Sequence, residues 1–151
     1  MYHIFTYLSI LWVSSMGLKK YKGNAKYNRS IGQNILTTSK VYNYKNGYFG
    51  VKGQSADPYV RNIFSENPLK TANDFYDRIA IGGEEEIIQT SKGTLRKTKM
   101  HDGTLVIMRN FSTSDGTPVV EINIKKSTHY SDIKEQKIHF CPNEYLQRRL
   151  F

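Results

Sequence analysis

One histidine of the sequence lies where it could transfer a proton. Residues 137–140 read Lys-Ile-His-Phe, so an extended strand would place Ile138 and Phe140 on one face and Lys137 and His139 on the other. The unperturbed pKa of imidazole is ~6.5, so His139 can accept or donate a proton near neutral pH. His139 is therefore a candidate general acid or base, although a histidine beside a lysine is more often a simple surface pair.

Cations and hydroxyl groups elsewhere in the sequence could bind an anion beside this histidine. Arg109 interrupts an apolar strand, and its planar guanidinium matches two oxygens of a phosphate. The alternative for Arg109 is a buried ion pair with Glu121. The remaining candidates are two lysines of the preceding strand and two hydroxyl donors of the following loop, Lys97, Lys99, Ser112 and Thr117.

These residue types suffice to cleave RNA without a metal ion. A base removes the proton of the ribose 2′-OH, the 2′-oxygen attacks the adjacent phosphorus, cations stabilise the phosphoryl oxygens and an acid protonates the leaving 5′-oxygen. DNA lacks the 2′-OH and would be spared. We assign His139 as acid or base, Arg109 as transition-state clamp and Lys97 or Lys99 as second cation. His101 is the rival for proton transfer, but its position in an Asp-Gly hairpin favours a turn role.

The clearest element that could support such a site is a helix beginning at Asn67-Pro68. Asn67 can cap free N–H groups, proline suits the first helical position, and Gly82-Gly83 is typical of a helix end. Asp74 can pair with Arg78 one turn later. Apolar residues recur at helical spacing, at Leu69, Ala72, Phe75, Tyr76, Ile79 and Ala80. We expect this helix to cover a core and to carry no chemistry.

Short extended segments follow the helix. They are separated by turn residues and cover 86–89, 94–100, 104–111, 119–124 and 137–140. This order predicts an α+β fold, in which an N-terminal helix packs on one face of an antiparallel sheet and the other face stays partly open. An open face of this kind can hold a substrate.

The distribution of charge divides the chain into three parts. Residues 1–56 contain eight Lys or Arg and no Asp or Glu, residues 57–140 contain twelve of each sign, and residues 141–151 carry a net charge of +1. We expect an apolar start with a basic, flexible arm over 1–56, one domain over 57–140 and a short C-terminal extension over 141–151. Within the domain, acids concentrate in 66–86 and cations in 92–109, so RNA affinity would depend on local charge.

Two features of the basic arm leave alternatives open. Residues 4–16 are apolar, but this run is shorter than the roughly 20 residues of a membrane span, and the lysines follow it instead of preceding it. A signal or anchor over 1–16 is thus weakly indicated, and we expect no stable membrane partner. Asn46-Gly47 could close a hairpin that either packs on the domain or stacks on bases.

The chain contains one cysteine, Cys141, so it has no internal disulfide. The four histidines are scattered and lack the close pairing that a zinc site requires. We therefore expect no metal and no cofactor.

The later part of the sequence resembles the C-terminal toxin domain of bacterial polymorphic secreted toxins of the contact-dependent, Rhs and LXG types. The resemblance covers about residues 57–140. It is carried by Arg109 and by five segments: residues 102–104 (DGT), 112–124 (STSDGTPVVEINI), 136–140 (QKIHF) and two lead-in segments, 55–58 (SADP) and 67–72 (NPLKTA).

The resemblance implies a fold like that of barnase, EndoU, colicin and RelE nucleases (BECR), with an N-terminal helix before a four-stranded antiparallel sheet. It further implies a metal-independent endoribonuclease that is secreted, acts in the cytoplasm of a competing bacterium and is inhibited by a cognate immunity protein. The matching site residues are Lys97 or Lys99, Arg109, the loop from Ser112 to Thr117, and His139. Such domains usually end a long secreted chain, so we expect an orphan module or truncated gene product, and a monomer.

Two readings from other classes remain open. One is a non-catalytic nucleic-acid-binding or immunity-interaction domain, in which His139 would be dispensable. The other is a toxin nuclease that acts on DNA.

Overall fold

The computed structural model describes residues 20–21, 30–128 and 132–150. Their elements in chain order are β1 (Lys20–Tyr21), α2 (Ile31–Thr38), β2 (Tyr44–Lys45), β3 (Tyr48–Phe49), β4 (Val51–Lys52), β5 (Val60–Ser65), α3 (Pro68–Ile79), β6 (Glu84–Thr90), β7 (Gly93–Lys99), β8 (Leu105–Arg109), β9 (Val119–Asn123), β10 (Gln136–Pro142) and α4 (Asn143–Leu150).

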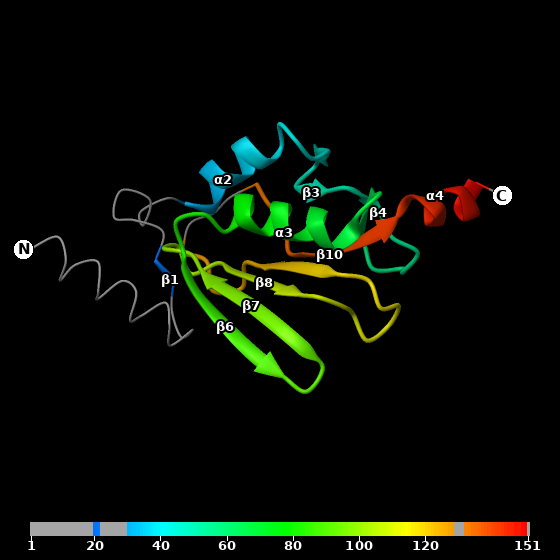
Figure 1. The fold of residues 1–151 in the computed structure, drawn as a ribbon. Coiled ribbons are helices and arrows are strands. Elements are labelled where there is room, and N and C mark those ends of the chain that lie inside the picture. Colours follow the sequence, from blue (N-terminus) through cyan, green and yellow to red (C-terminus); the bar gives the residue numbers. More distant parts are fainter. Residues whose placement is uncertain (1–19, 22–29, 129–131, 151) are drawn as a thin grey trace, which may run out of the picture.

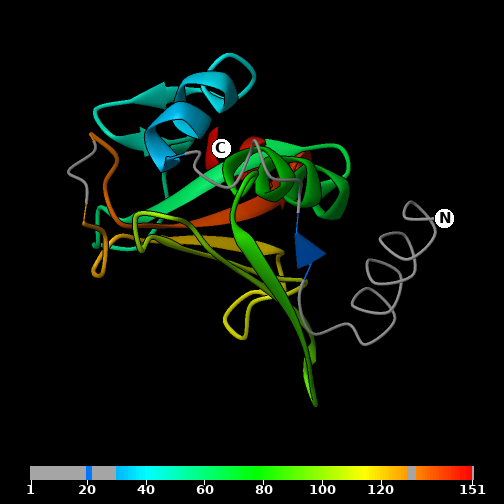
Figure 2. The same ribbon diagram turned by 90° about the vertical axis from the view of Figure 1, so that its left-hand side faces the viewer.

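The described strands form one large mixed sheet and one small hairpin. The large sheet has eight strands in the order β1-β6-β7-β8-β9-β10-β5-β4, and β2 pairs with β3. Neighbours from β6 to β10 are antiparallel, whereas β10 and β5 are parallel. Figure 1 shows α3 along the sheet, α2 above α3, and α4 at the end of β10. Figure 2 shows that α2 and α3 lie on the same side of the sheet.

The predicted helix is confirmed as α3. The Asn67 side chain accepts a hydrogen bond from the Lys70 backbone N–H at 3.2 Å, and Pro68 is the first helical residue. Arg78 Nε lies 2.8 Å from Asp74 Oδ2, as the spacing predicted. Ala72, Phe75, Tyr76 and Ile79 are buried against the sheet, but Leu69 is exposed. The helix therefore covers the core with one face.

The core lies between α3 and the face of the sheet that it covers. Strand alternation places Val106 and Met108 of β8 on this face, next to Val120 and Ile122 of β9. Ile138 and Phe140 of β10 continue the same layer. Because side chains alternate along a strand, the intervening residues of each strand project to the opposite face, which neither α2 nor α3 covers.

The α+β class is confirmed, but the expectation of a four-stranded antiparallel sheet is wrong. The meander includes β6, and the sheet continues past β10 to β5, which precedes the helix. β5 escaped prediction because Arg61, Asn62 and Ser65 interrupt its hydrophobic pattern. Arg61 is satisfied by tertiary contacts: its Nε and Nη2 donate to the carbonyl oxygens of Phe49 and Gly50 at 3.1 and 3.0 Å.

Residues 30–52, which the charge pattern assigned to a flexible arm, pack into the same core. Ile31, Ile35 and Phe49 are buried beside α3. The predicted Asn46-Gly47 turn is present, with φ of 54° and 85°, and closes the β2–β3 hairpin. The hairpin packs on the domain, where the buried Gln136 side chain accepts from the Phe49 N–H at 2.8 Å.

Residues 4–16, the apolar segment of the sequence, lie outside the described residues. Within the part of the chain that the structure describes, no helix has the length and apolar character needed to cross a membrane.

A buried ion-pair network joins α3 to the sheet. Arg96 Nε lies 3.1 Å from Glu85 Oε1, and Arg96 Nη2 lies 2.8 Å from Asp77 Oδ1. The Glu85 side chain is 2% exposed, and the Arg96 guanidinium carbon lies 4.3 Å from the centroid of the Tyr76 ring. Some of the acids of residues 66–86 and cations of residues 92–109 therefore stabilise the fold by pairing with each other.

Removal of this arginine is expected to destabilise the protein. Arg96→Met leaves the Glu85 carboxylate buried without its charge partner, and we expect the free energy of unfolding to fall by about 3 kcal/mol in urea titration. The matched control is Lys97→Met, the next residue on the opposite face, with an expected change within about 0.5 kcal/mol. Equal losses in the two variants would contradict a structural role for the network.

Candidate functional site

The uncovered face of the sheet carries most of the polar residues singled out in the sequence. Residues that pair directly across strands project to the same side. One row runs Leu95–Arg109–Val119–His139–Asn62, and the adjacent row runs Lys97–Ile107–Glu121–Lys137–Val60. The strand register therefore places Arg109 and His139 on one face of the sheet.

Arg109 and His139 are separated by one strand. Val119 of β9 lies between them, so their Cα atoms are two strand spacings, about 10 Å, apart. Glu121 is also on β9 and forms an ion pair with Arg109, with Oε2 2.6 Å from Nη1. The ion pair considered in the sequence exists, but it is largely exposed. The Nε and Nη2 groups of Arg109 have no protein partner among the described residues and remain available to an anion.

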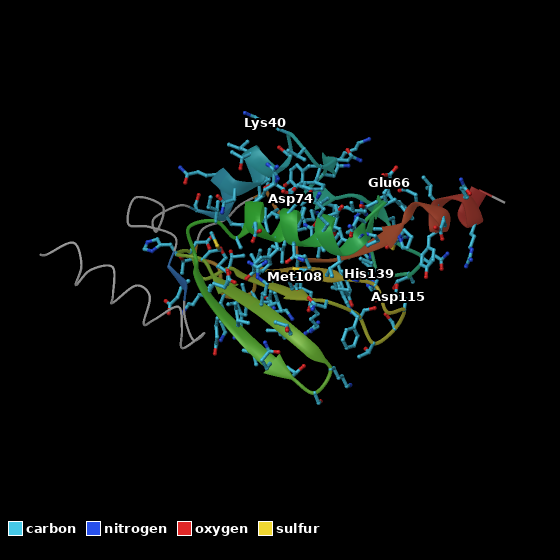
Figure 3. The ribbon with its side chains drawn as sticks, in the orientation of Figure 1. Lys40, Glu66, Asp74, Met108, Asp115 and His139 are labelled. Carbon is cyan, nitrogen blue, oxygen red and sulfur yellow. The ribbon has the colours of Figure 1, made fainter. Side chains whose placement is uncertain are left out.

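A loop folds back onto His139 and orients its ring. Nδ1 of His139 lies 2.9 Å from Thr117 Oγ1 and 3.2 Å from Asp115 Oδ2. Thr117 Oγ1 in turn donates to Asp115 Oδ1 at 2.7 Å, and Ser112 Oγ also donates to Asp115 Oδ1. Figure 3 shows Asp115, on the loop after β8, beside His139 on β10. The four side chains form one hydrogen-bonded cluster.

These bonds determine the tautomer of the neutral imidazole. The single hydroxyl hydrogen of Thr117 is directed to Asp115, so Thr117 Oγ1 accepts from His139, and the Asp115 carboxylate is also an acceptor. The proton of neutral His139 therefore resides on Nδ1. Nε2 keeps its lone pair and has no hydrogen-bond partner among the residues described.

The electrostatic surroundings keep His139 neutral and Asp115 charged. Burial lowers the pKa of His139, and although Asp115 raises it, the net shift is below the usual 6.5. Partial burial raises the pKa of the Asp115 carboxyl, but hydrogen bonds from Ser112 and Thr117 outweigh this, and its pKa is lowered to about 2. At pH 7 the pair is thus a neutral imidazole oriented by a carboxylate, an arrangement that suits a general base.

Two pockets flank the loop from Ser112 to Thr117. The first has a volume of about 460 Å³ and is lined by three cations, Lys92, Arg109 and Lys137, together with Ser112 and Phe111. The second has a volume of about 490 Å³ and contains His139 and Asp115. The cationic pocket suits a phosphate group, and the second pocket brings a ligand to the imidazole.

Not all predicted site residues reach these pockets. Lys97 and Lys99 of β7 lie opposite Glu86 and Glu84 of the neighbouring strand β6. Neither lysine lines either pocket. Lys97 lies three strands from Lys137 in its row. His101 lies exposed in the turn after β7, at the opposite end of β8 from Arg109. The lysines that line the cationic pocket are Lys92 and Lys137.

The sequence reading missed the part played by Asp115. It treated the loop from Ser112 to Thr117 as a source of hydroxyl donors to phosphate, whereas Ser112 and Thr117 hold the carboxylate that orients His139. A signal was present, because an Asp-Gly pair flanked by hydroxyl residues is typical of a turn in which the carboxylate accepts local hydrogen bonds. Within the described ranges, no group of three or more His, Cys, Asp or Glu side chains could hold a metal ion.

The influence of Asp115 on His139 can be measured directly. The carboxylate stabilises the imidazolium, so Asp115→Asn is expected to lower the pKa of His139 further, as read from its ring resonances in an NMR pH titration. Asp57→Asn, which changes an exposed carboxyl outside the cluster, is the control and should leave the titration unchanged. A rise in the pKa of His139 in the Asp115→Asn protein would contradict the described geometry.

Comparison of the chain with protein-family models, with curated proteins and with solved structures gives no match.

Proposed function

We propose that this chain is a metal-independent endoribonuclease domain that cleaves RNA by transfer to the ribose 2′-oxygen. One observation carries the proposal: His139 is oriented through Nδ1 by Asp115 and Thr117, and it shares a cross-strand row with the phosphate-binding candidate Arg109. A histidine held in this manner has a defined tautomer, a lowered pKa and a second nitrogen free to act.

His139 serves as the general base. Nε2 takes the proton of the 2′-OH, the bond between the 2′-oxygen and phosphorus forms, and the bond to the 5′-oxygen breaks. The resulting imidazolium is stabilised by the Asp115 carboxylate at Nδ1. The products are a 2′,3′-cyclic phosphate and a free 5′-OH.

Arg109 and Lys137 stabilise the charge that develops on the phosphoryl oxygens. Glu121 holds Arg109 through Nη1, which leaves Nε and Nη2 as a planar pair of donors for two oxygens. Lys137 lies on the same face, directly across from Glu121, and lines the same pocket as Arg109. Its ammonium group is the candidate acid that protonates the leaving 5′-oxygen.

The biological setting of the proposal rests on the resemblance to secreted bacterial toxins. The likeness to BECR nucleases rests on the sequence segments alone, because the sheet has more strands than that arrangement. On this proposal the domain is secreted, cleaves RNA in the cytoplasm of a competing bacterium, and is inhibited by a cognate immunity protein that binds the uncovered face.

Incubation of the purified chain with total RNA and with DNA in the presence of EDTA tests the reaction class. We expect RNA to be cleaved and DNA to remain intact, because only RNA supplies the attacking 2′-OH. Cleavage of DNA would favour the DNA nuclease reading. RNA that is bound but remains intact would favour a non-catalytic nucleic-acid-binding domain.

A further inference from the structure

The pocket that contains His139 is lined by several residues that have no part in the proposed proton transfer. It is bounded by β5, by β10, by the loop after β8 and by α4 of the C-terminal segment. Its lining includes two aromatic rings, Phe64 and Tyr145, two amides, Gln54 and Asn62, and one cation, Arg148. Its volume of about 490 Å³ lies within the range of pockets that hold small ligands.

We propose that this pocket is a nucleobase subsite, and that α4 makes it a determinant of which RNA sequence is cut. The proposal rests on the ribonuclease function proposed above and names the nucleotide that the site selects. Because His139 lies in this pocket and removes the 2′ proton, the base bound here belongs to the nucleotide whose 2′-oxygen attacks. Selectivity is therefore expected at the position on the 5′ side of the cleaved bond.

Tyr145 provides a surface for base stacking. Its side chain is 36% exposed and lines the pocket, so the ring is accessible to a ligand there. Stacking of a base on an aromatic ring is the common mode by which proteins bind unpaired nucleotides. The half-buried Phe64 ring lies across the same pocket on β5.

Arg148 and Asn62 supply the polar contacts that a nucleotide needs. The Arg148 guanidinium carbon lies 5.8 Å from the centroid of the Tyr145 ring, and Arg148 forms no ion pair with an acid of the described residues. It can neutralise a neighbouring phosphate. The Asn62 side chain has both a donor and an acceptor, makes no hydrogen bond within the described ranges, and can read the edge of a base.

The two pockets together define a path for the RNA strand. The base and ribose occupy the His139 pocket, and the scissile phosphate crosses the loop from Ser112 to Thr117 toward Arg109 and Lys137. Phe111, 38% exposed in the cationic pocket, offers a second ring for the following base. The chain therefore fits single-stranded RNA, whose bases are free to leave the stack.

The test measures binding separately from cleavage. A fluorescein-labelled RNA pentamer in which 2′-O-methyl groups replace all 2′-OH groups cannot be cleaved, and its affinity is read by fluorescence anisotropy. Tyr145→Ala is expected to weaken binding about 5- to 150-fold, the range for loss of one stacked base, while Tyr145→Phe retains wild-type affinity. Arg148→Ala is expected to weaken binding and to reduce the slope of log affinity against log salt by about one.

Leu146→Ala changes an exposed residue of α4 that does not line the pocket, and it serves as the matched control. Cleavage of the corresponding all-ribose pentamer is measured with the same proteins. Unchanged affinity and unchanged kcat/KM in Tyr145→Ala and Arg148→Ala, in a protein that cleaves RNA, would overturn the subsite and leave the ribonuclease function standing. Weakened pentamer binding in a protein that does not cleave RNA would retain the subsite and reject the ribonuclease.

Discussion

His139→Ala is expected to lower kcat for RNA cleavage by about 10²- to 10⁴-fold, the range in which a positioned general base contributes. The substitution removes the nitrogen that accepts the 2′ proton and leaves the clamp of Arg109 and Lys137 in place. Binding of uncleavable RNA should therefore be little affected. Steady-state kinetics on a defined RNA oligonucleotide, with anisotropy for binding, separates the two quantities.

His101→Ala is the matched control, because it removes the rival histidine at the far end of β7 and β8. We expect it to cleave at the wild-type rate. In the wild-type protein the rate should rise as pH increases through the lowered pKa of His139, since the base is active only when neutral. Asp115→Asn should shift this rise in rate to lower pH. Loss of activity in His101→Ala, with His139→Ala unaffected, would reverse the assignment.

Arg109→Ala is expected to lower kcat by about 10²- to 10³-fold, as for the removal of one preorganised donor to a developing oxyanion. The fold should tolerate the change, because an exposed ion pair contributes at most about 1 kcal/mol to stability. Arg109→Lys retains the charge but loses the planar fork, so only part of the rate should return. Kinetics and thermal unfolding of the two variants provide the measurement.

Glu121→Gln tests whether Arg109 acts in catalysis or only as the ion-pair partner of Glu121. It removes the charge that holds Arg109 Nη1 but leaves the guanidinium itself in place. We expect a smaller loss of activity than in Arg109→Ala. If Arg109→Ala cleaves as fast as wild type, Arg109 is only the ion-pair partner of Glu121, which is the alternative that the sequence left open.

Alternation along a single strand was enough to assign the two faces of β10. It put Lys137 and His139 opposite Ile138 and Phe140, and the structure has these faces as predicted. What alternation does not supply is register between strands. The register places Lys97 three strands from Lys137 in the same row, and Lys97 does not line either pocket.

Elements whose pattern is broken by polar residues were harder to predict. β5 has no clear alternation, because Arg61 and Asn62 interrupt its apolar residues. The hydrogen bonds from Arg61 to the Phe49 and Gly50 carbonyl oxygens exist only in the folded structure. α2 did have a readable start. Ser30 and Gln33 form a capping box, in which each side chain bonds the backbone N–H of the other residue, and this S-x-x-Q spacing is visible in the sequence.

The cluster around His139 depends on the folding of a loop, which no strand or helix period encodes. The Asp115 carboxylate reaches Nδ1 because the loop between β8 and β9 returns over the sheet, where Ser112 N–H donates to the Thr117 carbonyl oxygen at 2.6 Å. The residues of the loop were recognised, but their contact with His139 required the three-dimensional structure.

The most direct test of the proposed function uses a DNA oligonucleotide that contains a single ribonucleotide, incubated with the chain in EDTA. Transfer to a 2′-oxygen can occur at that nucleotide alone. We predict cleavage only at the bond 3′ to the ribonucleotide, a 2′,3′-cyclic phosphate on the upstream product by mass spectrometry, and loss of this product with His139→Ala. Cleavage at deoxynucleotides, or no cleavage with any of the four ribonucleotides at that position while a positive-control ribonuclease is active, would contradict the proposal.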